Sequence, residues 1–198
     1  MTIGVRCDRL YGAQLCGNAT QFRFWAPART AVMLEISGFA PIAMQRDAQG
    51  FFTAEASCSA GARYRYRLDA ELAVPDPASR WQAGDVHDSS IVVDPSSYVW
   101  RHHDWQGRPW SEMVIYELHA GCCGGFRGIE QRLPALAELG ITAIELMPIA
   151  DFSGRRGWGY DGVLPFAPDC SYGSPDDEPH GKSFMRTKCA AHPARSHP

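Results

Sequence analysis

The sequence predicts a multi-domain protein in which a β domain precedes an α/β unit. In the first hundred residues, short runs of alternating apolar and polar residues are separated by turn residues, as is typical of an all-β sandwich. After residue 112 the pattern changes to strand, helix, strand. With 198 residues, of which 45% are hydrophobic and 21% charged, the chain is long enough for one large or two small domains.

The strands of the β domain are identified by alternation and by the residues that end them. Tyr64 to Leu68 alternates aromatic and charged residues, which predicts one buried and one solvated face. Pro27 stops the ladder after Trp25, because proline cannot donate a backbone hydrogen bond. The domain is predicted to end near Tyr98. The expected strands are 22–25, 32–36, 51–54, 64–68 and 91–93.

A connecting segment follows at residues 99–112. It carries Trp100, Trp105 and Trp110. Three tryptophans in a connector indicate that it is packed between two domains.

The α/β unit begins with an apolar strand at 113–118. Helical spacing of Ile129, Leu133, Leu136 and Leu139 predicts a helix over 129–139, and Gly140 is a helix stop. A second apolar strand follows at 141–147. The right-handed crossover makes the two strands parallel neighbours, as in a doubly wound sheet or an eight-stranded barrel.

Two details of this unit carry further expectations. Pro134 lies within the helical pattern, so the regular part of the helix is expected to begin near it. The second strand runs into a loop with Arg155, Trp158 and Tyr160. A strand that ends in a loop rich in Gly, Arg and aromatics is how a sugar-binding barrel enzyme presents its site.

Charge and composition exclude several classes of partner. A net charge of −3 and a pI near 6.1 argue against nucleic acid and an anionic membrane surface. The sequence shows no signal-peptide core and no transmembrane-length apolar run, which predicts a cytoplasmic protein. Seven cysteines without C-x-x-C spacing predict reduced thiols, with no zinc site, and no cofactor motif is present.

Three motifs carry a family resemblance: RFWAP at 23–27, VIYELHAG at 114–121 and the long string at 141–173. Together they resemble the maltooligosyltrehalose trehalohydrolases of the α-amylase superfamily, over roughly the opening third of such enzymes. The resemblance implies an immunoglobulin-like β-sandwich of the glycogen-binding type at 1–98 and a linker at 99–112. The first βαβ unit of an incomplete (β/α)₈ catalytic barrel would follow at 113–177.

The residues after 177 depart from this pattern. The family continues into an amphipathic helix, whereas this chain reads EPHGKSF. We therefore expect residues 178–198 to be a disordered or frameshifted tail.

The resemblance implies a retaining glycoside hydrolase that cuts the α-1,4 bond of maltooligosyltrehalose in trehalose biosynthesis. That chemistry needs a carboxylate nucleophile and a carboxyl acid/base, which in the family come from the fourth and fifth strands. This chain shows two strands, so no catalytic residue is expected in it, and alone it should be inactive.

Other functions remain open at this point. An α-glucan branching or debranching relative is the alternative within the same superfamily. A non-catalytic remnant is another, whose sandwich binds α-glucan through exposed aromatics such as Trp25 or Trp81.

The resemblance also implies a substrate-binding set for maltooligosyltrehalose or another α-glucan. Tyr160 corresponds to the family's aromatic platform under the sugar, and Trp158 and Asp161 flank it. Glu117 and His119 lie at the end of the first strand and are expected to point toward the same barrel mouth, although they could equally hydrogen-bond the local backbone. No metal ligand is expected.

Overall fold

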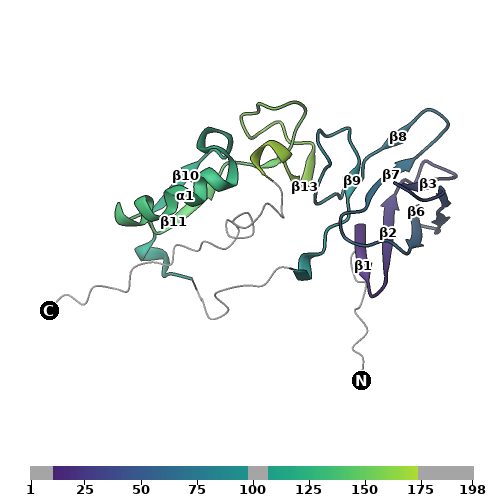
Figure 1. Cartoon of the computed structure of the whole chain (residues 1–198), viewed down its shortest axis with the longest axis horizontal. Helices are drawn as coiled ribbons and strands as arrows, with labels where there is room; N and C mark the ends of the chain where they lie inside the picture. Colours follow the sequence, from purple (N-terminus) through teal and green to yellow (C-terminus); the bar gives the residue numbers. More distant parts are fainter. Residues whose placement is uncertain (1–10, 98–106, 174–198) are drawn as a thin grey trace, which may run out of the picture.

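The computed structural model describes residues 11–97 and 107–173. We refer to residues 11–97 as the two-sheet region and to residues 107–173 as the α/β region. Figure 1 shows the β13 hairpin of the α/β region lying between the β10–α1–β11 unit and the β9 side of the two-sheet region. The hairpin is thus the part of the α/β region nearest the first hundred residues.

Two antiparallel sheets make up the two-sheet region. The first has the order β1-β2-β6-β5, and the second has the order β4-β3-β7-β8, with β9 paired to β7. The first contains β1 (Gly12–Cys16), β2 (Ala19–Trp25), β5 (Gln45–Arg46) and β6 (Phe51–Ala56). The second contains β3 (Met33–Ile36), β4 (Ile42–Ala43), β7 (Arg63–Arg67), β8 (Ala73–Val74) and β9 (Ser90–Ile91).

The alternating side chains of the two sheets face each other across one core. Phe22 and Phe24 of β2 pack on Tyr64 and Tyr66 of β7, with ring centroids 4.9 and 4.4 Å apart. All four rings are buried, while Arg65 between the tyrosines is only partly buried. The predicted alternation of 64–68 is therefore confirmed, because the aromatic positions are the ones that leave water.

A buried carboxylate lies in this core. Asp76 is 1% exposed and accepts hydrogen bonds from the hydroxyls of Tyr64 at 2.7 Å and Tyr66 at 3.3 Å, and from the backbone N–H of Ala78 at 2.8 Å. Burial raises the pKa of Asp76 and the pKa of both tyrosines above their ordinary values. The hydroxyls therefore remain protonated donors.

Replacing Asp76 with Ala is expected to lower the free energy of unfolding of the two-sheet region by about 2 kcal/mol, because two buried hydroxyls lose their acceptor. Urea unfolding followed by circular dichroism measures this. Asp94→Ala is the control, since its carboxylate accepts hydrogen bonds from Ser96, two residues away in the same turn. Equal losses in the two variants would contradict the account.

The α/β region contains the predicted parallel strand pair. β10 (Ile115–Leu118) and β11 (Ala143–Leu146) are parallel neighbours joined through α1 (Gly125–Glu138). The expectation that the helix begins near Pro134 is wrong, because α1 starts nine residues earlier. Pro134 costs one backbone hydrogen bond, but its ring is exposed, and buried Ile129 and Leu133 hold the helix against the strands.

A β-hairpin that the sequence did not predict follows β11. It consists of β12 (Ala150–Asp151) and β13 (Leu164–Pro168), which pair antiparallel. Short 3₁₀ helices are also present at η1 (Pro95–Ser97), η2 (Trp110–Glu112), η3 (Gly121–Cys123) and η4 (Cys170–Tyr172).

Several expectations are corrected or lie outside the described residues. Trp110 is 78% exposed, so the packed connector is wrong at this residue, while Trp100 and Trp105 lie outside the described residues. The tail at 178–198 also lies outside them. Cys16 is disulfide-bonded, so the expectation of reduced thiols fails there, whereas Cys58, Cys122, Cys123 and Cys170 are free.

No helix within 11–97 or 107–173 is long and apolar enough to cross a membrane.

Candidate functional site

The candidate site is the loop at 153–162 that joins β12 to β13, which we call the aromatic loop. Its two large rings are turned to solvent: Trp158 is 84% exposed and Tyr160 is 70% exposed. The residues that alternate with them, Gly157 and Gly159, face the protein and are half-buried and buried. This G-W-G-Y alternation presents two rings outward from a backbone held close to the hairpin.

Gly159 must be glycine, and Gly157 leaves little room for a side chain. A Cβ at Gly157 would lie 3.1 Å from ring carbons of Phe152, and a Cβ at Gly159 would lie 2.9 Å from the carbonyl oxygen of Pro148. Gly159 also has a φ of +92°, which L side chains rarely adopt. The aromatic rings are therefore supported by a closely seated backbone.

His119 holds the aromatic loop from the end of β10. Its Nδ1 accepts the backbone N–H of Cys122 at 3.2 Å, so Nε2 carries the ring proton and donates to the carbonyl oxygen of Gly157 at 2.9 Å. Tyr172 Oη lies 3.4 Å from Nε2, and the two rings pack edge to face. Both ring nitrogens are thus used for structure, and we read His119 as a residue that positions the loop.

The other predicted site residues lie apart from this arrangement. Glu117 is exposed on β10 and pairs in register with Glu145 of β11, so two carboxylates lie side by side on the strand pair. Asp161 is exposed beside Tyr160 in the aromatic loop. The structure brings Trp158, Tyr160 and His119 together around one loop, whereas Glu117 lies outside it.

Contacts with the two-sheet region were not predicted from the sequence. Asp85 Oδ2 accepts the backbone N–H of Gly154, at the start of the aromatic loop, at 2.7 Å. The thiol of Cys170 donates to the carbonyl oxygen of Gly84 at 2.7 Å. Val86 packs on Leu164 and Ala167 of β13 in a small buried cluster. These residues are 69 or more positions apart, and no local pattern signals them.

A buried acid lies at the base of the hairpin. Asp151 is fully buried, and neither carboxylate oxygen has a hydrogen-bond partner. Burial, together with the nearby charges of Asp169, Asp85 and Asp88, raises the pKa of Asp151 to about 7. Such shifts often mark catalytic acids. A general acid must reach its substrate, however, and Asp151 has no exposed surface, so we assign it no catalytic role.

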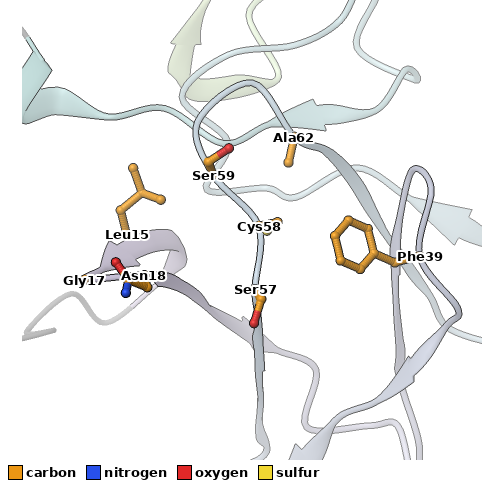
Figure 2. Close-up of a pocket in the computed structure, with 8 residues that line it drawn as sticks. All are labelled: Leu15, Gly17, Asn18, Phe39, Ser57, Cys58, Ser59 and Ala62. Atoms are coloured by element: carbon orange, nitrogen blue, oxygen red, sulfur yellow. The ribbon is translucent and has the colours of Figure 1, made fainter.

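The described part of the chain also has hollows away from the aromatic loop. One of them, of about 520 Å³, lies at an end of the two-sheet region, and Figure 2 shows the residues that line it. Phe39 is its aromatic wall, and none of its lining residues is charged. The lining residues are Leu15, Gly17, Asn18, Phe39, Ser57, Cys58, Ser59 and Ala62.

Within the described ranges, no three His, Cys, Asp or Glu side chains are placed to hold a metal ion.

The fold matches the N-terminal region of amylase-family enzymes. A crystal structure of a putative α-amylase from Salmonella typhimurium matches 89% of this chain and 32% of its own, with a TM-score of 0.81 and 43% identity. No family model matches the chain.

More specifically, the chain is homologous to the N-terminal part of malto-oligosyltrehalose trehalohydrolases. It is 41% identical over 169 residues to the Saccharolobus solfataricus enzyme and 39% identical over 173 residues to the Deinococcus radiodurans enzyme. These alignments cover 83% and 85% of this chain. The chain spans only 30% and 28% of the relatives' lengths.

Proposed function

We propose that this chain is the front end of a trehalose-releasing glycoside hydrolase, which hydrolyses the α-1,4 bond of maltooligosyltrehalose. Its contribution is to bind a glucose unit of the substrate on the aromatic loop. The observation that carries the proposal is the outward presentation of Trp158 and Tyr160 by a loop seated on glycine.

Sugar recognition suits this surface. The flat ring of Tyr160 offers an apolar face to the C–H side of a glucose unit, and exposed Asp161 and Arg156 supply polar groups for hydroxyls. His119 fixes the loop before substrate arrives, which lowers the entropic cost of binding.

The hydrolytic step itself needs residues beyond those described. A retaining mechanism requires two carboxyl groups about 5 to 5.5 Å apart on either side of the scissile bond. Asp151 and Asp169 are buried, so neither can reach a substrate. The family resemblance places the catalytic pair on the fourth and fifth barrel strands, which do not include Asp161. We therefore propose that this chain alone is inactive, and that sequence aligned with the remaining two thirds of the relatives supplies the pair.

The role of Tyr160 can be tested in a chimera of residues 1–173 with the remainder of the S. solfataricus relative. Tyr160→Ala is expected to lower kcat/KM roughly 10- to 100-fold, because a stacked ring contributes about 1.4 to 2.7 kcal/mol. Tyr160→Phe keeps the ring and should retain most activity. Leu139→Ala, at an exposed site just after the end of α1, is the control. Unchanged kcat/KM in Tyr160→Ala would refute the platform.

A second candidate function is α-glucan binding by the two-sheet region. It is favoured by Trp25, which is 53% exposed and whose Nε1 donates to the carbonyl oxygen of Gln49 at 3.2 Å, so the exposed ring is fixed. Trp81 is a weaker candidate, since it is partly buried. Retarded migration in a glycogen-containing native gel, lost in Trp25→Ala, would support this function, and unretarded migration would remove it.

A further inference from the structure

We propose that the two-sheet region positions the aromatic loop, with Asp85 as the positioning residue. This inference rests on the proposed function only for the identity of the ligand that the loop binds. The contact itself is a property of the free chain.

The first step is the placement of Asp85. It lies on the segment between β8 and β9, where Gln82 and Val86 are buried. Gln82 bonds the carbonyl oxygens of Val86 and Asp88, both at 3.4 Å, and Asp88 Oδ2 accepts the backbone N–H of Asp85 at 2.9 Å. The segment is therefore held internally before it meets the α/β region.

The second step is the contact across the two regions. Asp85 Oδ2 accepts the N–H of Gly154 at 2.7 Å, a charge-assisted bond at the first turn of the aromatic loop. Val86, the next residue, is buried against Leu164 and Ala167 at the other end of the same hairpin. The segment thus contacts the start of the aromatic loop and the strand that follows the loop.

The third step concerns the loop as a whole. Asp85 holds it at Gly154, and His119 holds it at Gly157, three residues later. One anchor comes from each region of the chain. Trp158 and Tyr160 follow directly after the second anchor, so their positions depend on both.

Amide hydrogen exchange of the whole chain, followed by NMR without any sugar, tests the inference. In Asp85→Ala, exchange at Gly154 should accelerate at least about tenfold, because the acceptor is lost. Asp85→Asn retains a carbonyl oxygen and should restore most of the protection. Asp69→Ala is the matched control: Asp69 also accepts two backbone N–H groups, from Glu71 and Leu72, within its own turn.

Two results would overturn the inference. One is unchanged exchange at Gly154 in Asp85→Ala. The other is equal acceleration at Gly154, Phe22 and Ile129, which would mean that the substitution destabilises the entire protein. A different result would count against the proposed function alone. If the chimera binds no sugar while the Gly154 amide of this chain shows the expected protection, the proposed function fails and the positioning role of Asp85 stands.

Discussion

Asp151→Asn is expected to stabilise the α/β region by about 3 to 4 kcal/mol at pH 8. Asp151 is fully buried, its carboxylate oxygens have no hydrogen-bond partner, and its pKa is raised from 3.8 to about 7. A pKa of about 7 in place of 3.8 means that ionisation of Asp151 costs the folded state roughly 4 kcal/mol. The amide avoids that charge while keeping nearly the same shape.

The pH dependence of stability gives an independent test of whether the charge on Asp151 destabilises the α/β region. Because the folded state binds the proton more tightly than the unfolded state, stability is highest below pH 4, falls as the pH rises toward 7, and is then constant for this group. Asp151→Asn should lack that decline, so the two proteins should differ little at pH 4. Hydrogen exchange of the backbone amides of α1, followed at several pH values, measures the stability of both proteins. Destabilisation by Asp151→Asn at pH 8 would contradict the account, since it would mean that the carboxylate has a cationic partner.

Phe152→Ala is expected to destabilise the α/β region by about 3 to 5 kcal/mol, the usual cost of removing a buried phenyl ring. Phe152 is 2% exposed, its ring centroid lies 5.8 Å from that of Tyr172, and Gly157 of the aromatic loop is seated on it. The substitution therefore removes both core volume and the support of the loop.

Hydrogen exchange of the same α1 amides, followed with added denaturant, measures this loss of stability. Phe166→Ala is the control, because Phe166 is exposed on β13 and its truncation leaves no internal cavity. The two-sheet region has a separate core and should keep its stability in both variants. Similar losses for Phe152→Ala and Phe166→Ala would show that the ring at 152 is not a core element.

Regular periodicity made part of the fold predictable. The alternation at 64–68 corresponds to β7, in which the two tyrosines are buried and the arginines are not. The apolar runs at 113–118 and 141–147 correspond to β10 and β11. The start of α1 was missed because Gly124 and Gly125 do not look like a helix start, and Pro134 was given too much weight. β13 was missed because it contains Pro165 and ends at Pro168.

The candidate site was also only partly predictable from the sequence. The exposed rings of Trp158 and Tyr160 could be expected from the loop sequence, and His119 was correctly placed after the first strand. Its hydrogen bond to Gly157 spans 38 residues, and the bond from Gly154 to Asp85 spans 69, so no local pattern signals either contact. Such contacts arise from packing between distant segments.

The most direct test of the central claim is the product formed from maltooligosyltrehalose by the chimera of residues 1–173 with the remainder of the S. solfataricus relative. The account predicts that the chimera releases trehalose, that the 198-residue chain alone releases none, and that Tyr160→Ala lowers the rate of the chimera. Trehalose release by the chain alone would contradict it, and so would a folded chimera that releases none.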